Sequence, residues 1–196
     1  LSEVLLDFLM ENDIVMDLDL SHNKMGFNCG ISISEGLIAN RCIKRLNISH
    51  NKIASAGVVS SNHFYKMLCM NYSMRELHIN GNRFGHEWGE KIAEGLARNT
   101  TLTKVDMRNT RISVEAGKAL TNVFAHNRHI MELALSLDDI CYASFARLRR
   151  VYAQKRAFIH PLHDMTKETL LSVEYHGHKL KTYDHHNEQQ DFEDDE

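Results

Sequence analysis

Thirteen histidines and four cysteines are the residues of this sequence that could bind a metal ion or react with an oxidant. Six of the histidines lie close to the C-terminal end, and imidazole is a good ligand for zinc, nickel and copper. These six are His160, His163, His176, His178, His185 and His186. No cysteine accompanies them at the spacing of a known metal site, so we predict that the chain has no metal-binding residues.

The four cysteines lie far apart in the sequence and lack the close pairing of a zinc or redox motif. They are Cys29, Cys42, Cys69 and Cys141. The simpler interpretation is a reduced compartment, in which a free cysteine acts as a small apolar side chain.

Catalytic motifs are also missing from the sequence. It contains no nucleophile elbow, no phosphate-binding glycine loop and no identifiable pair of catalytic carboxylates. His22 and His50 both occur in the tripeptide Ser-His-Asn, which indicates a repeated structural feature and not a catalytic pair. We therefore predict no catalytic residue, no cofactor and no enzymatic activity.

Five segments of the chain share one apolar frame and align without gaps. They begin at residues 15, 43, 74, 102 and 130 and read VMDLDLSHNKM, IKRLNISHNKI, MRELHINGNRF, LTKVDMRNTRI and IMELALSLDDI. Their central apolar positions, Leu18, Leu46, Leu77, Val105 and Leu133, are separated by 28, 31, 28 and 28 residues. The pattern L-x-x-L-x-L-x-x-N-x-L with this long period is typical of leucine-rich repeats, with a short strand in each segment.

Helical stretches separate these strands, because apolar residues recur at helical spacing around residues 36–40, 95–99 and 119–127. Asn12 precedes Asn40 by 28 residues, so we expect residues 1–12 to be the helix of an earlier repeat whose strand is missing. The second repeat has three extra residues between Asn51 and Asn71, which predicts a bulged loop or a longer helix at Ala54–Asn62.

The helix ending at Gly95–Leu102, with the sequence GLARNTTL, resembles the ribonuclease-inhibitor type of leucine-rich repeat. The resemblance covers about residues 1–140. It implies an α/β leucine-rich-repeat solenoid, with parallel strands on the concave face and helices on the convex face. The class includes enzyme inhibitors, GTPase activators, actin-filament cappers and axonemal or receptor scaffolds, so the resemblance is specific for fold and not for function.

We predict four parts in the chain. Residues 1–140 form the solenoid, with a half repeat, four clear repeats and one degenerate repeat. Residues 141–160 form a capping helix with an apolar stripe, although a basic amphipathic helix could instead meet a membrane surface or a helix-binding partner. Residues 161–183 form an irregular extension. Residues 184–196 carry seven acids and no Lys or Arg, which predicts a disordered acidic tail that solubilises the chain or binds a basic partner.

Outward-facing strand residues of neighbouring repeats should stack into columns across the concave face, the usual binding surface of a solenoid. The most informative column alternates in charge and can form lateral ion pairs: Asp17, Arg45, Glu76, Lys104 and Glu132. A salt-bridge ladder of little energetic value and a partner-binding surface are both compatible with it. The predicted partner-binding residues are this column together with Asp19, Asn47, His78, Asp106 and Arg108.

The function that follows is a non-enzymatic protein–protein interaction scaffold, a subunit of a larger hetero-complex in the cytoplasm, with a cytoskeletal or ciliary location suggested by analogy. The alternative is a regulator of an enzyme, such as a GTPase activator or an inhibitor, binding through the concave face. A net charge of −3 does not indicate a nucleic-acid partner, and no apolar run approaches the ~18 residues of a membrane span. Sequons at Asn47, Asn71 and Asn99 arise from the repeat itself, and a glycan on Asn71 or Asn99 would instead favour an extracellular receptor segment.

Overall fold

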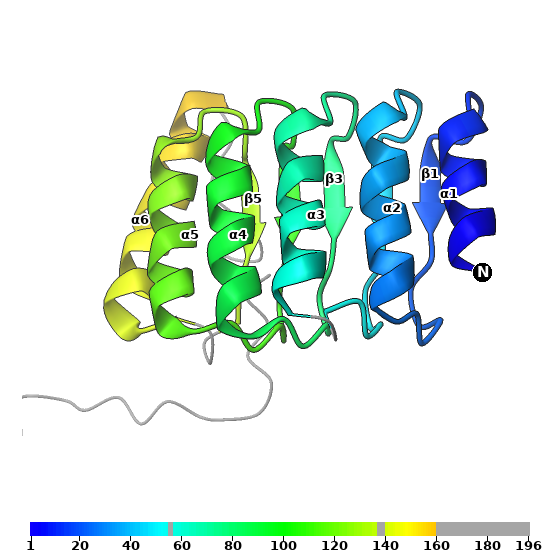
Figure 1. Cartoon of the computed structure of the whole chain (residues 1–196). Coiled ribbons are helices and arrows are strands. Elements are labelled where there is room, and N and C mark those ends of the chain that lie inside the picture. The colour runs from blue at the N-terminus through cyan, green and yellow to red at the C-terminus, as the bar shows by residue number, and fades with distance from the viewer. Residues whose placement is uncertain (55–56, 137–139, 160–196) are drawn as a thin grey trace, which may run out of the picture.

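Helices and short strands alternate along the whole described part of the chain (Figure 1). The computed structural model describes residues 1–54, 57–136 and 140–159. The elements are α1 (Ser2–Glu11), β1 (Asp17–Asp19), α2 (Phe27–Ala39), β2 (Arg45–Asn47), α3 (Val58–Met70), β3 (Glu76–His78), α4 (Gly85–Arg98), β4 (Lys104–Asp106), α5 (Val114–His126), β5 (Glu132–Ala134) and α6 (Tyr142–Ile159). The predicted extension at 161–183 and the predicted tail at 184–196 lie outside the described residues.

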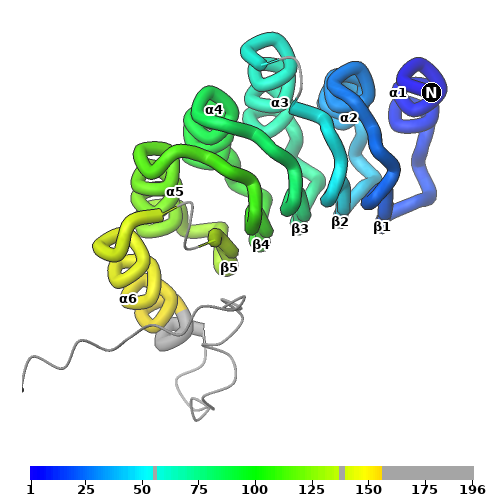
Figure 2. The backbone as a smooth tube through the Cα atoms, turned by 90° about the horizontal axis from the view of Figure 1, so that it is seen from below, coloured from blue at the N-terminus to red at the C-terminus, as the bar shows by residue number. Residues whose placement is uncertain are grey.

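The five strands form one parallel sheet in the order β1-β2-β3-β4-β5, so neighbours in sequence are neighbours in space. The register pairs Leu18 with Leu46, Leu46 with Leu77, Leu77 with Val105 and Val105 with Leu133. Figure 2 shows the chain curving so that the strands line the inner side of the arc and the helices its outer side. This is the α/β solenoid that the repeats predict, with strands on the concave face and helices on the convex face.

The core is a layer of apolar side chains between the sheet and the helices. Leu46, Leu77 and Leu133 from the strands are at most 1% exposed, and Leu37 and Leu96 from the helices are fully buried. Burying one such side chain stabilises the fold by about 1.5–3 kcal/mol. Because every repeat adds its own leucines to the same layer, the core extends continuously from repeat to repeat.

An asparagine follows each of the first five helices, and we call this row the helix-end ladder: Asn12, Asn40, Asn71, Asn99 and Asn127. From Asn40 onward, each side-chain Nδ2 donates to two carbonyls of the preceding repeat, as Asn99 does to Leu68 O at 2.8 Å and Asn71 O at 3.3 Å. The Oδ1 of Asn99 accepts the amide of Leu102 at 2.7 Å. The ladder therefore satisfies buried backbone groups that would otherwise cost free energy.

A second row of polar residues closes the strands, and we call its members the strand-end positions: Asn23, Asn51, Asn82 and Thr110. Asn51 Nδ2 donates to Leu20 O at 2.9 Å in the preceding repeat and to Ile48 O at 3.0 Å in its own repeat. Thr110 Oγ1 bonds Met107 O at 2.7 Å, within its own repeat. The threonine side chain is shorter than that of asparagine. It therefore makes the hydrogen bond within its own repeat but none to the described residues of the preceding repeat.

The three extra residues of the second repeat do not lengthen its helix. Helices α2, α3 and α5 all have 13 residues, but α3 begins at Val58, seven positions after the strand-end Asn51. Helix α2 begins at Phe27, four positions after Asn23. Residues 55–56, which precede α3, are outside the described residues.

Helix α6 packs against α5 and closes the sheet next to β5 (Figure 2). Leu148 and Val151 are 2% and 8% exposed, and Phe145 and Tyr152 are partly buried against the core. Tyr142, which the apolar stripe of the sequence includes, is 82% exposed and lies outside the packed face. Among the described helices, none combines the length and hydropathy that a membrane span requires.

Candidate partner-binding face

The first column of the concave face is assembled by the register of the sheet. Its members are Asp17, Arg45, Glu76, Lys104 and Glu132. Each is the Cα partner of the next across adjacent parallel strands, so the side chains lie in a row on one side of the sheet. The repeat alignment alone predicts this juxtaposition, and the observed pairing agrees with it.

Ion pairs form along most of this column. Arg45 Nε lies 3.2 Å from Asp17 Oδ1 and 3.9 Å from Glu76 Oε2, so one guanidinium bridges three strands. Lys104 Nζ lies 3.2 Å from Glu132 Oε2. The Arg45 and Asp17 side chains are 54% and 60% exposed, so water screens the pair and it stabilises the fold by only ~0–1 kcal/mol. These side chains remain accessible to a partner.

The second column begins with Asp19 and Asn47, whose Nδ2 donates to Asp19 Oδ2 at 3.0 Å. The Ser21 side chain and its backbone amide, 2.8 Å from Asp19 Oδ1, bond the carboxylate and lower the pKa of Asp19. Asp19 therefore stays ionised well below neutral pH. Next in this column, His78 Nε2 lies 3.7 Å from Glu76 Oε2, which ties the two columns together.

Asp106 and Arg108 form a charge pair that three hydrogen bonds hold together. Arg108 Nε lies 3.1 Å from Asp106 Oδ1, and its Nη2 lies 2.8 Å from Oδ2, a bidentate arrangement. The Arg108 amide adds a third bond to Oδ1 at 3.1 Å. Asp106 is only 6% exposed, so a partner meets this unit through the Arg108 side chain.

Sequence reasoning missed a pair of stacked rings at the edge of this face. The rings of His22 and His50 lie 4.4 Å apart, centroid to centroid, at an interplanar angle of 14°. Asn80 Nδ2 lies 3.3 Å from His50 Nε2. Gly81 takes the equivalent place in the third repeat, at φ +70°, where an added Cβ would lie 2.3 Å from His50 Nδ1. The repeated Ser-His-Asn followed by Asn-Gly-Asn is the signal that could have predicted this stack.

The chemistry of the face is that of a polar binding surface. The third column consists of Ser21, Ser49, Asn80, Arg108 and Ser136. The three columns contain carboxylates, amides, hydroxyls, one imidazole and three cations, without the large aromatic anchors that dominate tight interfaces. Within the described residues, no three His, Cys, Asp or Glu side chains gather as a metal site would require. The four cysteines are free. The arrangement is suited to recognising a charged protein surface.

A family model described as Leucine Rich repeat matches the sequence at residues 39–60 and 98–120. The first match spans the second strand, and the second spans the fourth strand and part of α5. Together with the parallel sheet and the 28-residue period, these matches identify the repeats of this chain as leucine-rich repeats. No curated protein matches the sequence significantly.

Two solved structures share the fold. Leiomodin-1 actin-binding site 2 covers 81% of this chain and 91% of its own, with a TM-score of 0.68 and 12% sequence identity. The tropomodulin C-terminal domain of Caenorhabditis elegans covers 82% of this chain and 96% of its own, with a TM-score of 0.65 and 14% identity. At these identities the likeness concerns the fold alone.

Proposed function

We propose that this leucine-rich-repeat solenoid is a non-enzymatic interaction scaffold that binds a protein of the cytoskeleton through its concave face. The observation that carries the proposal is the row of exposed charged side chains on β1 to β5, aligned by the sheet register. The sheet holds these groups in place before binding, so little ordering entropy is lost when a partner arrives.

The composition of the face favours electrostatic recognition over hydrophobic anchoring. Such a surface steers the encounter and selects partners of complementary charge more than it raises affinity. We therefore expect binding of moderate strength that weakens as salt is added. A subunit of a hetero-complex, which gains further affinity from other contacts in the assembly, suits this behaviour.

Actin is the first partner to test, because one structure of the same fold is an actin-binding site of leiomodin-1. A shared fold supports a choice of candidate and does not establish a function. The cytoskeletal location of this chain is part of the same proposal. A location in the cilium would require microtubule-associated partners, so microtubules form the second arm of the test.

The test is co-sedimentation of the full chain with actin filaments and, separately, with microtubules, together with anisotropy measurements on labelled actin monomers. The test variant is Arg45→Glu with Lys104→Glu, which reverses the two cations of the first column. The matched control is Lys66→Glu with Lys118→Glu, which makes the same charge change on exposed positions of α3 and α5.

Binding to actin that falls about tenfold in the concave-face variant but not in the control would support the proposal, since each reversal replaces attraction by repulsion. Equal binding by the wild type and the concave-face variant would overturn the assignment of the face. Binding to microtubules alone would overturn the choice of actin while retaining a cytoskeletal partner.

A further inference from the structure

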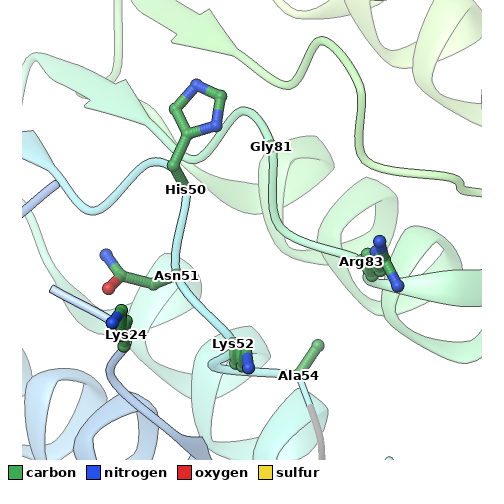
Figure 3. Close-up of a pocket in the computed structure, with 7 residues that line it drawn as sticks. All are labelled: Lys24, His50, Asn51, Lys52, Ala54, Gly81 and Arg83. Atoms are coloured by element: carbon green, nitrogen blue, oxygen red, sulfur yellow. The ribbon is translucent and has the colours of Figure 1, made fainter. Parts of the chain in front are cut away.

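A pocket lies among the residues that follow β1, β2 and β3, next to the stacked ring of His50. Its volume is about 620 Å³. It is lined by Lys24, His50, Asn51, Lys52, Ala54, Gly81 and Arg83. Figure 3 shows Lys24, Lys52 and Arg83 following one another across three consecutive repeats, with Asn51 and His50 beside them. The pocket therefore belongs to several repeats and not to one loop.

The charged side chains among the described lining residues are all cations. Lys24, Lys52 and Arg83 are all exposed cations, and none of the seven described lining residues is acidic. Each cation directly follows a strand-end asparagine, and Arg111 follows the strand-end Thr110 in the next repeat. The repeat thus presents a cation at the same position four times in succession.

Backbone geometry does not require a long basic side chain in this row. Lys24 and Arg111 have φ values of 56° and 56°, in the left-handed region, where glycine or asparagine is accommodated at the lowest cost. These two positions nevertheless carry cations. A long side chain at a position whose backbone conformation disfavours it suggests a role in binding.

One hydrogen-bond contact between neighbouring repeats is made at the first repeat and is missing, among the described residues, at the second. In the regular first repeat, the amides of Asn23 and Met25 bond Asn51 Oδ1 at 3.1 and 3.0 Å. The equivalent atom, Asn82 Oδ1, is buried and has no hydrogen-bond partner among the described residues. The acceptor contact made by Asn51 is therefore not repeated by Asn82.

The spacing of the cations indicates the kind of anion that fits. Adjacent parallel strands lie ~4.8 Å apart, so cations placed once per repeat form a row and do not converge on one point. A single phosphate needs donors that converge on its oxygens. In an extended acidic chain successive side chains point to opposite sides, so alternate residues place carboxylates on one side about every 6.6 Å. The long, flexible Lys and Arg side chains can reach such a row.

We propose that the pocket formed by Lys24, Lys52 and Arg83, extended by Arg111, is a binding groove for an extended acidic segment of a partner protein. This site is separate from the concave columns, and its ligand is recognised by a row of carboxylates. The proposal goes beyond the cytoskeletal function and does not depend on actin binding.

The test measures fluorescence anisotropy of a labelled peptide of alternating Glu and Ser added to the full chain at several salt concentrations. A peptide of alternating Gln and Ser serves as the uncharged probe. The test variant is Lys24→Gln with Arg83→Gln. The matched control is Lys66→Gln with Lys118→Gln, which removes the same charge from exposed positions on α3 and α5. Circular dichroism melts confirm that both variants fold.

We expect the acidic peptide to bind about tenfold more weakly to the pocket variant and with a shallower dependence on salt, while the control binds as the wild type does. The uncharged peptide should not bind. An equal loss in both variants would overturn the proposal, because it would show attraction by net charge alone. Displacement of the peptide by inorganic phosphate at equivalent ionic strength, beyond that by chloride, would overturn the peptide assignment in favour of a small-anion site.

Discussion

The two ends of the solenoid carry the same repeat frame but bury it to different degrees. At the C-terminal end, Leu133 and Leu135 of the last strand segment are each 1% exposed, and Tyr152 of α6 hydrogen-bonds the Leu133 backbone. At the other end, Leu18 and Leu20 are partly exposed, and β1 pairs with β2 alone among the described strands. Position in the stack, and not the repeat sequence, decides how deeply a leucine is buried.

Polar atoms of α6 complete the closed end. The hydroxyl of Tyr152 accepts the Leu133 amide at 2.5 Å and donates to the Leu133 carbonyl at 2.8 Å, so it satisfies the edge of β5. Lys155 Nζ donates to Asn127 O at 2.7 Å and to Ile130 O. One helix, α6, thus supplies hydrogen-bond partners to backbone groups at the edge of β5 and at the end of α5. The outer edge of β5 is covered in this way.

The N-terminal end of the described residues carries several exposed apolar side chains. They include Leu1, Val4, Phe8, Ile14 and Met16, of which Ile14 is 82% and Met16 58% exposed. Asn12, the first member of the helix-end ladder, uses its Nδ2 on Val15 O at 2.9 Å within its own repeat. At the C-terminal end, by contrast, α6 supplies apolar cover and hydrogen-bond partners together.

The largest expected difference between the two ends is in the free energy of unfolding lost when the central strand leucine of each end is truncated. Leu133→Ala should lower the free energy of unfolding by about 3 kcal/mol, since its site is fully enclosed, and Leu18→Ala by about 1 kcal/mol. Urea unfolding followed by Trp88 fluorescence measures both losses. Equal losses would contradict the conclusion that α6 makes the C-terminal core tighter.

Removal of one hydroxyl tests the closed edge directly. Tyr152→Phe leaves the Leu133 amide and carbonyl without that partner and should cost about 1–3 kcal/mol. The Leu133 amide should also exchange its hydrogen faster, as measured by NMR. Tyr142→Phe is the control, because that ring is 82% exposed and its change should leave stability unaltered. A Tyr152→Phe variant with wild-type exchange at Leu133 would show that the hydroxyl is dispensable.

The Lys155 ammonium makes the closed end depend on pH. Burial lowers the pKa of Lys155 to about 8 from its ordinary 10.5. Between these values the unfolded chain holds more protons than the folded chain, so stability rises with pH across this window. Lys155→Met removes the titration, so the wild type should gain stability relative to the variant as pH rises from 8 to 10.5. A constant difference in melting temperature would argue against a lowered pKa.

The smallest effect on stability is expected at the N-terminal end of the described residues. Ile14→Ser with Met16→Ser should change the free energy of unfolding by no more than about 0.5 kcal/mol, because both side chains are largely exposed. The same variant should self-associate less at high concentration, since exposed apolar patches promote association. Sedimentation velocity of the two proteins measures this. A large loss of stability would mean that this end is more enclosed than its exposure indicates.

The architecture could be predicted from the sequence because the repeats share one pattern of apolar residues and asparagines. The spacing of Leu18, Leu46, Leu77 and Val105 sets strand register directly, so the charged column of Arg45 and its neighbours follows from alignment alone. The helix-end asparagines are equally predictable, since they recur with the period.

Features outside the period were harder to predict. The Asp106–Arg108 bidentate pair depends on side-chain rotamers. The pocket lined by Lys24, Lys52 and Arg83 depends on how the turns of three repeats pack together, which the repeat period does not describe. Tyr142 and Tyr152 both fit an apolar stripe, yet one is exposed and the other bonds a strand edge. Helical spacing identifies a face but not which polar atom meets which backbone group.

Lys155 also shows how the length of such an array is set chemically. It lies 28 residues after Asn127 and its Nζ reaches the carbonyls of Asn127 and Ile130, the place where a further asparagine would stand. An asparagine offers an acceptor as well as a donor, so it can receive the amides of a following segment, whereas an ammonium only donates. This residue therefore terminates the series of hydrogen bonds from one repeat to the next. Engineers who wish to lengthen the array should begin by exchanging this one side chain.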